Sequence, residues 1–135
     1  MYSTLDYDSE GVVYGYKFLV AFVALVVCDS AWIMFSGKRD LYPTSGRPFP
    51  VMMGLMLSYD LMAAFFIALV NSDSYGTQAA TSVVLALWVY GTFNLTSLAT
   101  NDEWSVKTAS MDTFVGITVY MITFMAVKLV HEAQS

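Results

Sequence analysis

The stretch Tyr90–Gly116 decides the fold, and it reads YGTFNLTSLAT, then NDEWSVK, then TASMDTFVG. Polar side chains recur inside both of its apolar segments, and the part between them is richer in charge. Residues three or four positions apart lie on the same face of a helix. The polar and small residues therefore form two stripes, one on each helix: Tyr90, Asn94 and Ser97, and Thr108, Asp112 and Gly116. This pattern predicts two helices that are joined by a tight turn.

The composition of the chain is typical of a membrane protein. Hydrophobic residues make up 57% of its 135 residues and charged residues only 13%, whereas a soluble protein carries about a quarter charged residues. Charge this sparse cannot cover a surface that faces water, so we expect the lipid bilayer to cover much of it. The net charge of -5 argues against a nucleic acid as partner, because no basic stripe is present to meet phosphates.

Four apolar runs follow one another along the chain, at residues 14–35, 49–70, 77–98 and 106–130. About 20 apolar residues suffice for a helix to cross the hydrocarbon core of a bilayer. The connections are short, which forces neighbouring helices to run antiparallel. We therefore expect a single transmembrane domain over residues 1–135, built as an all-α, integral membrane four-helix bundle of up-down-up-down topology.

The basic residues predict the orientation of this bundle. One side of the membrane would carry Lys38, Arg39, Arg47 and Lys107, and the other side Lys17 and Lys128. Cytoplasmic loops are enriched in Lys and Arg, so we expect both termini on the non-cytoplasmic side. Trp104, in the third loop, is expected to anchor that loop at the membrane interface, as the residues of aromatic belts do.

Four polar residues interrupt the apolar runs: Asp29, Asp60, Asn94 and Asp112. At about 1.5 Å of rise per residue, Asp29, Asn94 and Asp112 would lie roughly 6–9 Å inside the same membrane face, with Asp60 deeper. Trp32 lies three residues after Asp29, so its indole ring can lie beside the carboxyl group. The sequence therefore predicts one polar intramembrane cluster, formed by Asp29, Trp32, Tyr90, Asn94, Ser97, Thr108 and Asp112.

Two interpretations of this cluster remain open. An ionisable side chain inside a bilayer costs at least about 2.5–3.5 kcal/mol, so such residues are often functional, and the cluster would then be a polar pocket or conduit. Alternatively, its side chains bond to one another and hold the helices together, with Gly91 and Gly116 allowing close approach. Asp29, Asn94 and Asp112 offer few oxygens for a hard cation such as Ca²⁺, so we expect no metal and no cofactor.

The same residues resemble a known family over nearly the whole chain. Tyr90–Thr100, followed by Trp104 and Asp112, is similar to the motif Y-x-T-Y-D-L-T-N-L-A-T, then W, then D-x-x-W-G. This motif is that of the small membrane proteins grouped as the domain of unknown function 2177 family. Asp29 and Trp32 match the early D-x-x-W of that family.

The chain departs from the family motif at several positions. Asn94 stands where the family has Asp, Ser97 where it has Asn, and Val115 where it has a second Trp. The loss of one acid argues against a proton-coupled or ion-coupled role that needs two facing carboxylates. Because that family has no established activity, the resemblance implies four membrane spans and a polar cluster, but no reaction.

The sequence favours a small non-catalytic integral membrane protein, a structural or assembly subunit of a larger membrane-associated complex. Its loops are short, and nothing in it resembles a catalytic triad, a phosphate-binding loop or a nucleophile elbow. The alternative is an oligomeric channel or transporter for a small ion or solute that uses the Asp and Asn residues of the cluster. A third function is an intramembrane enzyme acting on lipid, with Asp and Tyr side chains as acids and bases. The expected partners are the bilayer and other membrane subunits or further copies of the chain.

Overall fold

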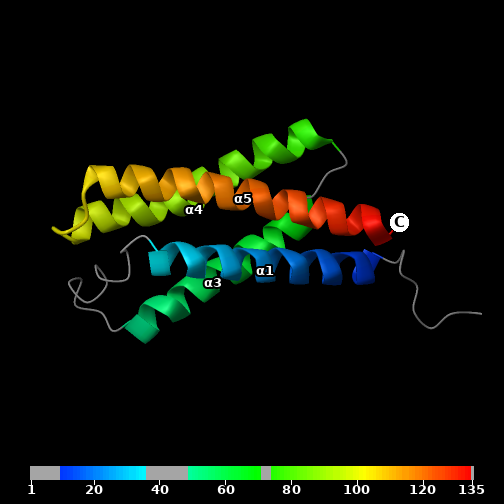
Figure 1. Ribbon diagram of the computed structural model, residues 1–135, viewed down its shortest axis with the longest axis horizontal. Coiled ribbons are helices and arrows are strands. Elements are labelled where there is room, and N and C mark those ends of the chain that lie inside the picture. Colours follow the sequence, from blue (N-terminus) through cyan, green and yellow to red (C-terminus); the bar gives the residue numbers. More distant parts are fainter. Residues whose placement is uncertain (1–9, 36–48, 71–73, 135) are drawn as a thin grey trace, which may run out of the picture.

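The computed structural model describes residues 10–35, 49–70 and 74–134, and these residues form four helices (Figure 1). They are α1 (Glu10–Phe35), α3 (Phe49–Val70), α4 (Tyr75–Thr100) and α5 (Val106–Gln134). The expectation of an all-α fold is confirmed. Each of these helices is long and apolar enough to cross a membrane, by length and composition.

Three of the helices extend past the apolar runs that predicted them. For example, α1 begins at Glu10 instead of residue 14, and α5 continues to Gln134 instead of ending at residue 130. Hydropathy marks only the part of a helix that suits lipid, whereas the backbone hydrogen bonds of the helix continue into its polar flanks. Hydropathy therefore underestimates the length of these helices.

The helices pack as a bundle in which α5 contacts both α4 and α1, α1 also contacts α3, and α3 touches α4 only slightly (Figure 1). The buried core combines small and large side chains, among them Ala21, Leu25, Ala63, Ala64, Ile67, Ala86, Tyr120, Phe124 and Val127. Small residues let the backbones of membrane helices approach closely. The larger side chains fill the space that the alanines leave between the helices.

The turn at residues 101–105 joins α4 to α5 and brings Trp104 back toward the bundle. The Asn101 N–H donates to the carbonyl of Ser97 at 2.9 Å at the end of α4. The side-chain oxygen of Asn101 accepts from the Glu103 N–H at 3.0 Å. Its carbonyl accepts from the Trp104 N–H, also at 3.0 Å. Asn101 thus fixes the backbone of the turn through both of its oxygens, and this sets the position of Trp104.

Serine side chains cap the first turns of α4 and α5. Ser74 Oγ accepts from the Thr77 N–H at 3.3 Å, and Ser105 Oγ accepts from the Thr108 N–H at 3.0 Å. The first N–H groups of a helix have no partner within the helix, and such caps satisfy them. Both helices therefore begin at defined residues, which fixes the position of the polar stripes along them.

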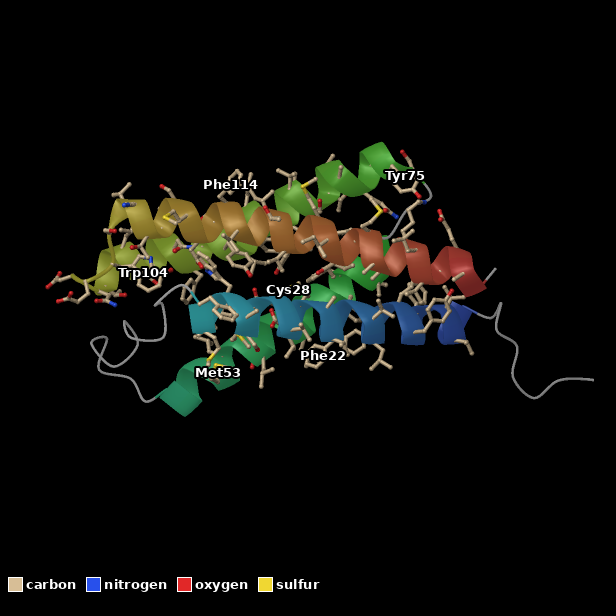
Figure 2. All side chains as sticks on the ribbon, in the orientation of Figure 1. Phe22, Cys28, Met53, Tyr75, Trp104 and Phe114 are labelled. Atoms are coloured by element: carbon tan, nitrogen blue, oxygen red, sulfur yellow. The ribbon has the colours of Figure 1, made fainter. Side chains whose placement is uncertain are left out.

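Large apolar side chains face outward from all four helices. Leu19, Phe65, Trp88 and Phe114, one from each helix, all expose more than half of their surface, and Phe114 reaches 71%. Figure 2 shows Phe114 on the outer side of α5, where it lines a shallow pocket together with Leu95 of α4. Soluble monomers rarely expose continuous apolar surface on this scale. The outer surface is therefore suited to lipid or to the apolar helices of a partner.

Candidate functional site

Asp112 is the centre of the polar cluster, and its side chain is only 1% exposed. Its Oδ1 accepts a hydrogen bond from Trp32 Nε1 at 2.7 Å, and its Oδ2 accepts one from Asn94 Nδ2 at 2.7 Å. An indole N–H and an amide NH₂ can only donate, which suits the two acceptor oxygens of a carboxylate. The two bonds join α5 to α1 and to α4.

Asn94 extends the cluster from Asp112 to the turn between α4 and α5. Its Oδ1 accepts from Trp104 Nε1 at 3.0 Å, while its Nδ2 also donates to the carbonyl of Tyr90 at 2.8 Å. Because the indole of Trp104 can only donate and the carboxylate of Asp112 accepts, the two ends of the amide are not interchangeable. The cluster therefore fixes the orientation of the Asn94 side chain.

A direct bond between α4 and α1 lies beside these contacts. The Tyr90 hydroxyl donates to Asp29 Oδ1, and the Tyr90 ring packs edge-on against Tyr120, with 5.6 Å between the ring centroids. At Gly116 of α5, an added Cβ would overlap the Tyr90 ring. Gly116 therefore provides the close approach that the sequence predicted. The same prediction for Gly91 is wrong, because an added Cβ there would meet nothing within 4 Å.

Thr108, which the sequence placed in the cluster, bonds locally at the start of α5 instead, and for Ser97 the described contact is that of its backbone carbonyl at the end of α4. The carbonyl of Ser97 accepts from the Asn101 N–H where α4 ends. The hydroxyl of Thr108 bonds to Ser105 Oγ at 2.9 Å where α5 begins. Helical spacing put both residues on the face of the cluster. Near a helix end, however, a short polar side chain such as that of Thr108 can bond to neighbouring groups of the turn.

Trp104 is a member of the cluster that the sequence reading missed. We expected it to anchor the loop at a membrane interface, but its side chain is 5% exposed, and its ring packs edge-on against Phe93 with 5.8 Å between centroids. Folding the turn inward buries the indole ring and satisfies its N–H on Asn94 at the same time. The sequence does contain a signal for this contact: Asn94 is an amide inside an apolar run, and the indole donor Trp104 follows in the next turn.

A cavity of about 50 Å³ adjoins the cluster, and carboxyl groups from two helices form part of its lining. Asp29 of α1 and Asp60 of α3 both line it, and they are 6% and 3% exposed. The sequence placed Asp60 at a deeper level, apart from the predicted cluster. The structure instead brings Asp60 to the same cavity as Asp29, with aromatic and aliphatic side chains forming most of the remaining wall.

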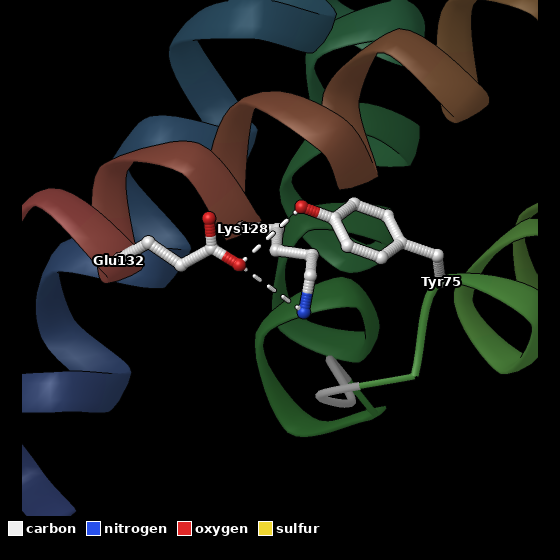
Figure 3. Close-up of polar contacts among 3 residues, drawn as sticks. All are labelled: Tyr75, Lys128 and Glu132. Atoms are coloured by element: carbon white, nitrogen blue, oxygen red, sulfur yellow. Dashed lines mark hydrogen bonds and ion pairs between the residues drawn. The ribbon is translucent and has the colours of Figure 1, made fainter.

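A second polar group lies where α4 begins and α5 ends (Figure 3). Lys128 Nζ is 4.4 Å from the centre of the Tyr75 ring and 3.6 Å from Glu132 Oε1. The Tyr75 hydroxyl donates to the same carboxylate oxygen at 3.4 Å. His131, which follows Lys128 on α5, hydrogen-bonds to Tyr16 of α1 and so joins these two helices. The sequence placed Lys128 near the end of a span but did not predict its burial. In the structure the Lys128 side chain is only 6% exposed.

The geometry of the cluster favours cohesion between helices over catalysis. A general acid or base must lie within about 2.6–3.2 Å of the substrate proton that it transfers. In the cluster, Asp112 uses both oxygens, and Asn94 both ends of its amide, for bonds of 2.7–3.0 Å to other side chains. Their partners come from α1, α4, α5 and the turn, so these polar atoms bond within the protein.

Three of the six basic residues that predicted the orientation lie outside the described part of the chain. Lys38, Arg39 and Arg47 lie in a segment that the structure does not describe, and Lys107 is exposed in the first turn of α5. The placement of both termini on the non-cytoplasmic side therefore stays a prediction.

Comparison with known proteins found no match: no family model, no curated protein and no solved structure is similar to this chain. The resemblance of the segment 90–116 to the domain of unknown function 2177 family stays a prediction. The function is therefore argued from the geometry of the cluster and of the cavity.

Proposed function

We propose that this chain is a small non-catalytic integral membrane protein that serves as a structural or assembly subunit of a larger membrane-associated complex. The observation that carries this proposal is the mutual bonding of three buried side chains, Asn94, Trp104 and Asp112, with the partly buried Trp32. Polar side chains that bond to one another hold membrane helices in one relative position. The apolar outer surface is then available to lipid and to partner helices, either of other subunits or of further copies of the chain.

Membrane insertion and the up-down-up-down topology are part of this proposal. The Trp32–Asp112 bond joins the last turns of α1 to the first turns of α5. The Tyr16–His131 bond joins the first turns of α1 to the last turns of α5. These two contacts support opposite directions for α1 and α5, as alternation predicts. With both termini on one side, the positive-inside rule favours the non-cytoplasmic side for them.

An oligomeric channel or transporter for a small ion or solute is the second candidate, and one observation favours it. Asp29 and Asp60 line one cavity, and acidic side chains inside membrane helices often mark ion pathways. The cavity is small for a pathway, since about 50 Å³ accommodates about one or two water molecules. Transport would therefore require a pore between several copies of the chain.

The two candidates are separated by measuring flux and assembly for the same protein. The chain is purified and reconstituted alone in liposomes, and the movement of Na⁺, K⁺ and protons is followed with ion-sensitive dyes. The subunit proposal predicts the flux of protein-free vesicles, unchanged by Asp29→Asn or by Asp102→Asn, an exposed control in the turn. In mild detergent, the chain from its own membranes is expected to migrate as one stoichiometric complex larger than its monomer.

Each outcome decides between the candidates. Flux above that of protein-free vesicles, lost in Asp29→Asn but kept in Asp102→Asn, would replace the subunit proposal by the transport candidate. A monomer recovered from native membranes, with no flux, would contradict both. Alkaline extraction tests membrane insertion separately, because an integral protein stays in the membrane pellet and a soluble or peripheral one is released.

A further inference from the structure

The cavity beside the cluster has a polar, buried floor and an apolar, exposed rim. All four helices contribute to its lining. Its floor contains Asp29, Asp60 and Tyr120, of which Tyr120 is only 1% exposed. Its rim contains the partly exposed Phe93 and the exposed Leu55. The buried part of the lining therefore carries carboxyl and phenol groups beside the apolar Ile33, and its exposed part is apolar.

The charge and the rings of the lining favour a cationic ligand. Among the described residues that line the cavity, two are acidic and none is Lys, Arg or His. Five aromatic rings also line it, those of Trp32, Tyr59, Tyr90, Phe93 and Tyr120. The faces of aromatic rings attract cations, and more strongly where water is excluded. Ionised carboxyl groups are costly in the interior of a membrane, and a bound cation offsets that cost.

The kind of cation follows from the scarcity of oxygen ligands. Ca²⁺ takes roughly six to eight oxygens, and Mg²⁺ demands a nearly octahedral shell. A wall that is mostly aromatic and aliphatic cannot supply either. An ammonium group needs few acceptors and is stabilised by ring faces. The cavity of about 50 Å³ has room for a group the size of about one or two water molecules, which an ammonium group matches.

We propose that this cavity binds the ammonium group of a lipophilic amine, with the carboxyl groups of Asp29 and Asp60 at its charged end. The Tyr90 hydroxyl bonds to Asp29 Oδ1 and so orients that carboxyl group. The apolar tail of the amine passes Leu55 and Phe93 at the rim, and its exit into lipid rests on the proposed membrane insertion. Binding of the ammonium group itself requires no partner subunit, so this proposal and the subunit proposal can fail independently.

The test uses butylammonium as the probe and the full chain, purified in a non-ionic detergent, with isotope-labelled tryptophan for NMR. Trp32 lines the cavity, whereas Trp88 is 63% exposed on the outside of α4. We expect a saturable shift of the Trp32 indole resonance without a matching shift of Trp88. Butanol, a neutral molecule of similar size, is expected to leave both resonances unchanged.

Two variants test the role of charge. Asp60→Asn is expected to raise the half-saturating concentration of butylammonium about tenfold or more, because the amide oxygen can still accept a hydrogen bond but the charge of the acceptor is lost. Asp102→Asn removes the same charge from the exposed turn and is expected to leave that concentration unchanged. The Trp32 resonance of each variant without ligand shows whether the bundle is folded.

Several results would overturn the proposal. The absence of a saturable Trp32 shift with butylammonium would do so, and so would equal shifts with butylammonium and butanol, because the cavity would then select apolar shape and not charge. These two comparisons use the original chain, so they decide the matter even if Asp60→Asn does not fold. An unchanged half-saturating concentration in a folded Asp60→Asn protein would also contradict the role of this carboxyl group.

Discussion

Replacing Asn94 by Leu removes the amide that joins α5 to the turn while keeping a side chain of similar shape. Two buried polar atoms then lose this partner: Trp104 Nε1, which donates to the amide at 3.0 Å, and Asp112 Oδ2, which accepts from it at 2.7 Å. Both side chains are almost fully buried, at 5% and 1% exposure. Water therefore cannot replace the lost bonds without opening the bundle.

The expected magnitude follows from these two atoms. A buried polar atom that loses its partner costs about 1–3 kcal/mol, which gives an upper range of about 2–6 kcal/mol for the pair. Interhelical hydrogen bonds in membrane proteins contribute less, about 0.6 kcal/mol on average and about 1.7 kcal/mol at most. Lipid tails are as apolar as Leu, so the new side chain gains no hydrophobic free energy over separated helices in the bilayer. We therefore expect Asn94→Leu to lower the free energy of unfolding by about 2–3 kcal/mol.

The assay is reversible unfolding in mixed micelles with increasing denaturing detergent, followed by circular dichroism. Thr96→Val is the matched control, since it removes a hydroxyl from an exposed position of the same helix, and it is expected to change the free energy by less than about 0.5 kcal/mol. A double-mutant cycle with Trp104→Phe is expected to give a coupling of about 1 kcal/mol. An Asn94→Leu protein as stable as the Thr96→Val control, or a coupling of zero, would refute the reasoning.

Two further changes are tested in the same unfolding assay. Gly116→Ala is expected to lower the free energy of unfolding by about 1–3 kcal/mol, because the added Cβ overlaps the Tyr90 ring. Gly91→Ala meets nothing and is expected to be neutral or to stabilise α4 by up to about 1 kcal/mol, so equal effects at both glycines would contradict this packing. Lys128→Met is expected to cost about 0.5–2 kcal/mol, because its ammonium lies over the Tyr75 ring, and an unchanged stability would contradict that contact.

The helices could be predicted because each corresponds to one long apolar run, with few charged or amide side chains, between more polar segments. The meeting of Asn94 with Asp112 also follows from the sequence, since the short turn at residues 101–105 fixes the level of one helix against the other. The pairing of Trp32 with Asp112 is harder to foresee. The rise per residue gives the depth of a side chain, but its direction depends on how each helix is rotated about its axis.

The predictions from sequence were wrong for residues whose side chains could bond either to nearby residues in the sequence or to another part of the bundle. Trp104 was expected at the membrane interface, but it bonds to Asn94 inside the bundle. Lys128 was expected only near one side of the membrane, but its ammonium group lies over the Tyr75 ring. Thr108 does the opposite and bonds to Ser105 at the start of its own helix. The partner that each side chain bonds to depends on which polar or aromatic groups lie close to it once the helices are packed. The periodicity of a single sequence does not give the distances between residues of different helices.

The central claim is that buried polar side chains of α1, α4 and α5 bond to one another inside a bilayer. Its most direct test is the dipolar coupling between the indole nitrogen of Trp32 and the carboxyl carbon of Asp112, measured by solid-state NMR on the chain in lipid vesicles. Trp32 Nε1 and Asp112 Oδ1 are 2.7 Å apart, which brings the carboxyl carbon close enough to the nitrogen for a detectable coupling, and we predict that this coupling disappears in Trp32→Phe. Absence of this coupling, with the Trp32 indole in contact with lipid acyl chains instead, would contradict the claim.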